Sequence, residues 1–298
     1  MATVRIVTDS SCDLPSELIG DLPITVLPNR VQLDGEWLVE GIDLAPGDWQ
    51  ARSLTPGSPP ALEPPDLLTF TNAYASLSRG TDGIISIHSS ARLSNVLTIA
   101  GKARGYHYDR TQVLVVDSES ATMGLGYIVL QAAQAAQSGG SLRDILDLVR
   151  TIIHQTHVIF VADAAEAPLL LGRSRPEVLV GTGGGTAVAT RPVTTASSPN
   201  GRPVLKLEEG RIVPLEHVRN RTKALERLYE FVEIFPKVEQ VCLVHGARAL
   251  GDVEWLLKRI DPIFPRKDVR VIPYGPAMIR FVGHHAIGVV AYEGAEPE

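Results

Sequence analysis

Several common signatures are missing from this sequence of 298 residues, and each absence narrows the class of protein. The chain has no long run of lysine or arginine, and its formal net charge is −6. Because a surface that binds phosphates is normally basic, we expect no nucleic-acid partner. No apolar run approaches the ~20 residues that span a bilayer. The first residues lack the charged and apolar segments of a secretory signal. We therefore expect a cytoplasmic protein without a transmembrane segment.

Cysteine is scarce, and Cys12 and Cys242 are its two examples. Each of them follows or lies in a predicted strand. A free cysteine usually behaves as a small buried side chain, and disulfide bonds are rare in proteins of the cytosol. We expect both thiols to be buried and unpaired.

Recognisable catalytic and cofactor motifs are also missing. The glycine-rich segment 181–186 lacks the Lys-Ser/Thr pair of a P-loop, so we interpret it as a surface turn. No Gly-x-Ser-x-Gly elbow is present to support a hydrolase. His154 and His157 are three residues apart and His284 and His285 are adjacent, but neither pair has the flanking ligands of a metal site. We predict no metal and no cofactor.

The first half of the sequence alternates short apolar runs with helical stretches. The runs predict strands at 4–8, 24–27, 83–87 and 113–116, and the stretches predict helices at 65–77, 93–104, 123–137 and 142–153. The last helix follows Gly139 and Gly140, with Ser141 as its expected N-cap. The segment 54–65 contains five prolines and is interpreted as a rigid loop that leads into the first of these helices. This alternation predicts a parallel sheet covered on both faces.

The second half has more short strands and turn signals. Strands are predicted at 158–161, 187–190, 204–207, 212–214, 240–244, 269–272 and 286–292, and helices at 221–232 and 251–260. Turn dipeptides such as Asn200-Gly201 separate some of these strands. We therefore expect a second α/β domain with a mixed sheet. With a boundary near Gln155, the domains are residues 1–155 and 156–298.

Polar side chains follow three of the predicted parallel strands. The segments are 8–11 (Thr-Asp-Ser-Ser), 88–90 (His-Ser-Ser) and 117–120 (Asp-Ser-Glu-Ser). Ligands of open parallel sheets bind where strand carboxyl ends meet helix N-termini, and such hydroxyls and amides favour an anionic oxygen. Alternatively, each serine only caps the helix that follows it. The apolar stretches 123–136 and 162–171 could line a long pocket, although ordinary core is the better interpretation.

Motifs along nearly the whole chain resemble those of the DegV family. The opening segment 7–15 (Val-Thr-Asp-Ser-Ser-Cys-Asp-Leu-Pro) matches the family's first signature, and further matches lie at 34–35, 40–44, 87–94, 115–126, 210–216 and 218–224. The resemblance implies a two-domain α/β fold that holds a long-chain fatty acid in an apolar tunnel between its domains. In many bacteria such a protein is the binding subunit of fatty acid kinase. It presents the acyl carboxylate to a separate catalytic subunit and has no ATP site of its own, which agrees with the missing P-loop.

The resemblance also implies which residues bind the head group. The serine of the family's Leu-Ser-Gly-Thr segment falls on Ser94, and an arginine of the family falls on Arg173. Ser90 and Asn95 are secondary candidates beside Ser94. The surface arginine that meets the kinase corresponds to Arg219. These residues are expected to bind or present a ligand, and no catalytic residue is predicted.

Two positions depart from the family pattern. Ala61 stands where the family has a threonine, and Phe281 stands where it has a histidine. One interpretation is that the acyl site persists without them. A second is that His284 or His285 supplies the imidazole from a shifted position. A third is that the head group is no longer a carboxylate that can be phosphorylated. We therefore hypothesise a fatty-acid carrier, with or without a kinase partner. The alternative is an enzyme or binding protein for another small anionic ligand.

Overall fold

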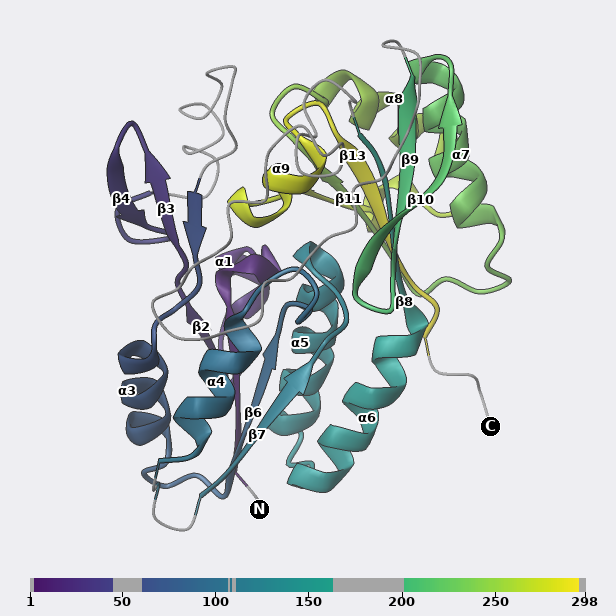
Figure 1. Ribbon diagram of the computed structural model, residues 1–298. Coiled ribbons are helices and arrows are strands. Elements are labelled where there is room, and N and C mark those ends of the chain that lie inside the picture. The colour runs from purple at the N-terminus through teal and green to yellow at the C-terminus, as the bar shows by residue number, and fades with distance from the viewer. Residues whose placement is uncertain (1–2, 45–60, 107, 109–110, 163–200, 295–298) are drawn as a thin grey trace. The chain divides into compact units, whose positions relative to one another are not determined.

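The computed structural model describes residues 3–44, 61–106, 108, 111–162 and 201–294 (Figure 1). The chain divides into two compact units. Described residues up to Thr156 belong to the first unit, and those from His157 to Gly294 belong to the second. Both units are α/β structures, as the sequence predicts.

The first unit is built on a four-stranded parallel sheet in the order β2-β1-β6-β7. Its strands are β1 (Val4–Asp9), β2 (Ile24–Leu27), β6 (Gly83–His88) and β7 (Gln112–Asp117). Ile6 pairs in parallel with Ile24 on one side and with Ile85 on the other. β1 and β6 are almost wholly buried, as expected of parallel strands covered on both faces. The predicted parallel sheet is confirmed.

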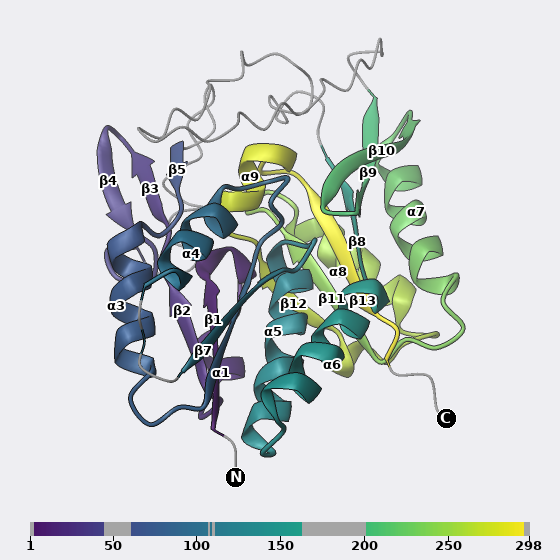
Figure 2. The ribbon, with the colours of Figure 1, turned by 60° about the horizontal axis from the view of Figure 1, so that its bottom comes forward.

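Helices cover both faces of this sheet (Figure 2). They are the short η1 (Ser10–Cys12) and α1 (Ser16–Ile19), then α3 (Leu67–Leu77), α4 (Val96–Arg104), α5 (Thr122–Gln137) and α6 (Leu142–Gln155). Phe70 and Tyr74 of α3 pack with Val96 of α4 against one face. α5 is buried along most of its length. Ser141 caps α6 in a capping box with Asp144, which confirms the predicted N-cap.

A small antiparallel sheet in the first unit was not predicted. It has the order β4-β3-β5 and consists of β3 (Arg30–Leu33), β4 (Glu36–Val39) and β5 (Ala61–Glu63). Asp34 and Gly35 both have positive φ, at 52° and 85°, as a tight two-residue hairpin turn requires. The prediction of loop from 54 to 65 is wrong at 61–63, because these residues pair with β3. Residues 45–60 lie outside the described residues.

The second unit contains a six-stranded mixed sheet in the order β10-β9-β8-β13-β11-β12. Its strands are β8 (Thr156–Val161), β9 (Arg202–Glu208), β10 (Arg211–Val218), β11 (Gln240–His245), β12 (Arg270–Pro273) and β13 (Ile287–Tyr292). β11 pairs in parallel with β12 and antiparallel with β13, so the predicted mixed sheet is confirmed. The predicted strand 187–190 and the glycine-rich segment 181–186 lie outside the described residues.

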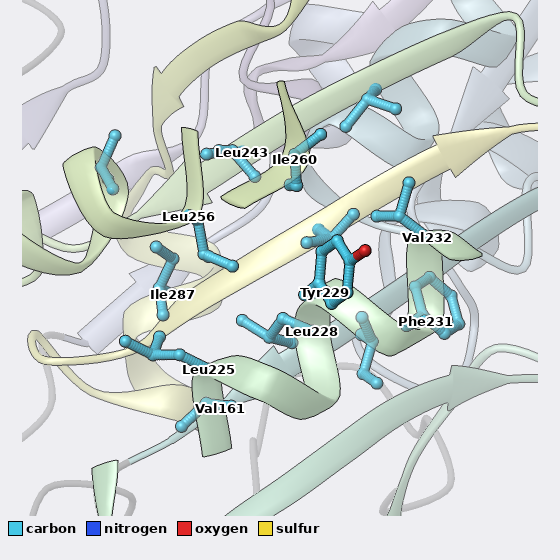
Figure 3. Packing of buried hydrophobic residues seen from close by; sticks show 14 of the residues in the cluster. Val161, Leu225, Leu228, Tyr229, Phe231, Val232, Leu243, Leu256, Ile260 and Ile287 are labelled. Atoms are coloured by element: carbon cyan, nitrogen blue, oxygen red, sulfur yellow. The ribbon is translucent and has the colours of Figure 1, made fainter. Parts of the chain in front are cut away.

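The helices of the second unit are α7 (Arg221–Glu233), α8 (Leu250–Ile260), η2 (Arg266–Asp268) and α9 (Pro276–Val282). Of these, α7 and α8 pack on the sheet through a large apolar core. Leu228 of α7, Leu256 of α8 and Ile287 of β13 are fully buried in one cluster (Figure 3). Cys12 and Cys242 are both buried and free of disulfide bonds, as predicted. Among the described residues, no helix has the length and apolar character needed to cross a membrane.

Candidate functional site

The polar segments predicted from the sequence gather at the carboxyl edge of the first sheet. β1 ends at Asp9, β6 ends at His88 and β7 ends at Asp117, and His88 pairs in register with Asp117. In the order β2-β1-β6-β7, the chain runs outward from β1 to β2 on one side and from β6 to β7 on the other. The strand order therefore reverses between β1 and β6. Open α/β sheets bind ligands at such a switch point.

Asp9 joins two of the loops at this edge. Its Oδ2 lies 2.8 Å from Nδ1 of His88, and its Oδ1 accepts a hydrogen bond from the backbone N–H of Ser11 at 3.1 Å. Asp9 and His88 are both fully buried. Burial raises the pKa of the Asp9 carboxyl, but His88, through its hydrogen bond and charge, and the hydrogen bonds of Ser11 outweigh burial and hold that pKa below its usual value. Asp9 is therefore an ionised anchor between the two loops.

A chain of buried hydrogen bonds continues from His88 into the sheet. Ser86 Oγ lies 2.6 Å from Nε2 of His88 and accepts a hydrogen bond from the Tyr74 hydroxyl at 2.7 Å. Each of these four side chains, Asp9 included, has a hydrogen-bond partner of the right kind when His88 carries its proton on Nδ1. Both hydrogen-bonding positions of the Ser86 hydroxyl are taken, one by Tyr74 and one by His88, so it is not offered to a substrate. The Asp-His-Ser arrangement here holds the edge of the sheet together and is not a hydrolytic triad.

The small antiparallel sheet is tied to the same edge through Glu40. Ser10 donates from Oγ to Oε2 of Glu40 at 2.5 Å, and Ser10 Oγ accepts from the backbone N–H of Asn29 at 2.9 Å. Burial, reinforced by the charge of Asp9, raises the pKa of Glu40 to about 7 against the hydrogen bonds of Ser10 and Asn29. The edge therefore holds one carboxyl group that is ionised and one that titrates near neutral pH.

Three predicted site residues lie together on the loop between β6 and α4. The carbonyl of Ser90 accepts from the N–H groups of Leu93 and Ser94 at 2.9 and 3.0 Å, which forms a tight turn. The sequence analysis predicted that this helix begins at residue 93. Because of the turn, α4 begins at Val96 instead. Ser94 Oγ accepts from the Val96 N–H at 3.2 Å, so its own proton remains available to a ligand oxygen. Asn95 is exposed and makes no side-chain capping bond.

The other predicted site residues lie elsewhere in the described structure. Ala61 is an exposed residue of β5 in the first unit. Phe281 lies in α9 of the second unit, and His284 follows that helix; both are partly buried. Arg219 is exposed between β10 and α7. Arg173 lies outside the described residues.

The start of α5 adds Thr122, which the sequence analysis did not single out, to the predicted polar segment 117–120. Thr122 opens the helix with a positive φ of 50°, and Glu119 has the same φ. A β-branched residue rarely adopts this backbone conformation. Ala121, at the N-cap position, provides no side-chain hydrogen bond. The hydroxyls of Ser120 and Thr122 are buried. A serine-rich loop before a helix predicts caps for that helix, whereas the observed helix start has none.

Comparison with known proteins identifies the family. The sequence profile of the DegV family, described as a family of uncharacterised proteins, matches residues 3–167 and 196–294. A DegV domain-containing protein of Mycobacterium bovis is 30% identical over 301 residues, with 99% of each chain covered. This chain therefore belongs to the DegV family.

Solved structures of the family share the fold. A fatty acid binding DegV family protein from Streptococcus agalactiae superposes with a TM-score of 0.81 at 20% identity, covering 99% of this chain and 100% of that one. A stearic acid-binding protein from Eubacterium ventriosum gives a TM-score of 0.76 at 19% identity, covering 98% of this chain and 99% of that one. At these identities the similarity establishes the fold.

Proposed function

We propose that this protein binds a long-chain fatty acid and is not itself an enzyme. The acyl chain lies in an apolar tunnel between the two domains, residues 1–155 and 156–298, and the carboxylate lies beside Ser94. The fatty acid binding of the Streptococcus agalactiae and Eubacterium ventriosum proteins, which have the same fold, supports the ligand class. The family resemblance of the motifs supports the tunnel and a place in the cytoplasm.

The proposal rests most on the hydrogen bonding of the Ser94 hydroxyl. It accepts a backbone hydrogen bond at the start of α4 and keeps its proton for a ligand. The positive end of the α4 dipole favours an anion at the same place. Ser90 and Asn95 flank the position, and Arg173 supplies a cation by the family resemblance. With Ala61 and Phe281 unable to donate, His284 or His285 provides an imidazole if the head group requires one.

The bound ligand can be tested directly. We expect mass spectrometry of an extract of the purified protein, loaded with oleate, to recover the acid in equimolar amount. Ser94→Ala and Arg173→Ala are each expected to weaken retention at least tenfold, because a hydrogen bond to a charged group contributes about 1.5–3 kcal/mol. Ser78→Ala is the control, since Ser78 is a partly exposed residue whose hydroxyl donates to the carbonyl of Ala75 in its own helix. Wild-type protein that retains no acyl chain would refute fatty-acid binding and favour a different small anionic ligand.

We further propose that the carboxylate is presented to a fatty acid kinase, with Arg219 at the contact. Arg219 is exposed beside β10, as a contact residue must be. Incubation of the oleate-loaded protein with a kinase subunit and ATP should yield acyl phosphate, and Arg219→Glu should slow its formation at least tenfold. Arg211→Glu, an exposed arginine on β10, should have no effect. Absence of product with every variant would indicate a carrier without a kinase partner.

A further inference from the structure

Four hydroxyl groups near the carboxyl edge of the first sheet lack hydrogen-bond partners. They belong to Thr8, Ser89, Ser120 and Thr122, and none of them contacts a donor or acceptor among the described residues. These residues are at most 4% exposed. A buried polar group without a partner costs about 1–3 kcal/mol. Four such groups in one region indicate that something outside the described chain satisfies them.

The positions of these hydroxyls relate them to α5. Val7 packs with Phe70 and Tyr74 on the α3 face of the sheet, so Thr8, as the next residue of the strand, points to the opposite face. α5 contacts β1 and η1, and a methyl group at Gly126 would come within 2.7 Å of the carbonyl oxygen of Cys12. The first turns of α5 therefore lie close against the end of β1. Thr122 is the first residue of this helix.

The start of α5 is also joined to the loop that carries Ser94. The backbone N–H of Ser90 donates to the carbonyl of Ser120 at 2.9 Å, and the N–H of Ser118 donates to the carbonyl of His88 at 3.1 Å. Ser118 Oγ accepts from the Ser120 N–H and uses its proton within the loop. Its hydroxyl is therefore satisfied, whereas that of Ser120 is left for another partner.

The electrostatics of this place favour an oxygen anion. α5 has 16 residues and no side-chain cap, so its first amides and the positive end of its dipole are available. Serine and threonine hydroxyls can each add a donor. The buried Asp9 carboxylate is engaged by His88, whose ring packs against Phe70 on the α3 face. An anion on the α5 side would therefore meet donors, while the Asp9 carboxylate is paired with His88 and the Asp117 carboxylate accepts from the backbone N–H groups of Ala91 and Glu119.

We infer that Ser89, Ser120 and Thr122 bind the carboxylate of the fatty acid at the N-terminus of α5. This inference rests on the proposed function and extends the head-group site from Ser94 at the start of α4 to the start of α5. One carboxylate oxygen accepts from Ser89 and Ser94 of the loop between β6 and α4, and the other accepts from Ser120 and Thr122 at the start of α5. The two helix N-termini then share one negative charge.

Titration calorimetry with oleate and with methyl oleate tests this assignment. Thr122→Val and Ser120→Ala should each weaken oleate binding about tenfold, as expected for one hydrogen bond to a charged group. Binding of methyl oleate, which carries no charge, should change less than threefold. In the ligand-free protein, Thr122→Val should leave the thermal midpoint unchanged or raise it, because an isosteric methyl group replaces an unsatisfied hydroxyl.

Thr111→Val is the matched control. Thr111 Oγ1 donates to the carbonyls of Ser78 and Thr81 at the amino edge of the sheet, so its loss should lower stability and leave oleate affinity intact. If Ser94→Ala weakens binding while Thr122→Val and Ser120→Ala bind oleate as the wild type does, the inference is wrong and the proposed function stands. An equal loss for oleate and methyl oleate also overturns it. If the wild-type protein binds no oleate, the proposed function fails and the inference fails with it.

Discussion

Two carboxyl groups near the end of β1, the buried Asp9 and the partly buried Glu40, show how single partners set the charge of a site. Asp9 has an imidazole and a backbone N–H as partners and a lowered pKa. Glu40 has a hydroxyl and an amide, and its pKa is raised to about 7. Burial acts in the same direction on both, so the difference comes from the charge and geometry of the partners. As a result, the ionised Asp9 lies beside Glu40, which can release a proton near neutral pH.

The raised pKa of Glu40 predicts a dependence of stability on pH. The folded protein keeps the Glu40 proton up to a pKa of about 7, whereas the unfolded chain releases it near 4.5. Between these values the folded state binds more protons, so the free energy of unfolding falls as pH rises. The whole loss amounts to about 3 kcal/mol. Urea unfolding from about pH 5 to about pH 8 should show most of this loss in the wild type and lack it in Glu40→Gln.

Glu36→Gln provides the control for that measurement, because Glu36 is an exposed carboxylate on β4, the strand that directly precedes Glu40. Its stability should follow the wild-type curve at every pH. A constant difference between wild type and Glu40→Gln across the range would contradict the prediction. It would mean that Glu40 is already ionised in the folded protein at the acid end of the range.

At the level of single residues, the sequence located part of the candidate site. Ser90 and Ser94 could be named because they follow a strand rich in isoleucine and match a family motif, and Asn95 because it stands next to Ser94. Thr122 could not be named as a site residue, because the pattern of the segment 122–137 predicts a continuous apolar helix. The absence of a cap at Ala121 depends on backbone angles that the loop imposes. Whether Ser94 and Arg173 bind the head group remains a prediction.

At the level of elements, long periodic segments were predictable and short ones were not. The helices predicted at 123–137 and 142–153 agree with α5 and α6 to within two residues at each end, since local apolar patterns determine them. β5 has three residues and exists because Arg30–Leu33 offers a pairing edge far away in the sequence. α9 was likewise missed, although Pro276 stands at its first position. Elements of this length depend on tertiary partners more than on their own residues.

At the level of the whole molecule, each unit has its own sheet and its own apolar core. The core of the first unit includes Phe70 and Ile84, and that of the second includes Leu228 and Leu243. Domains of this kind can open separately. A ligand that contacts both must therefore stabilise both, whereas a ligand confined to one should protect that one alone. This difference makes the proposed tunnel between the domains measurable without a structure of the complex.

Hydrogen exchange of the backbone amides, followed separately in the two units, tests the tunnel. We expect Leu228→Ala to lower the free energy of opening in the second unit by about 2–5 kcal/mol, because it leaves a cavity in a fully buried position. Saturating oleate should slow exchange at β6 of the first unit and at β11 of the second, in the wild type and in this variant. Protection confined to β6 would place the ligand within the first unit alone. In that case the carboxylate site at α4 and α5 could stand, but the tunnel between the domains could not.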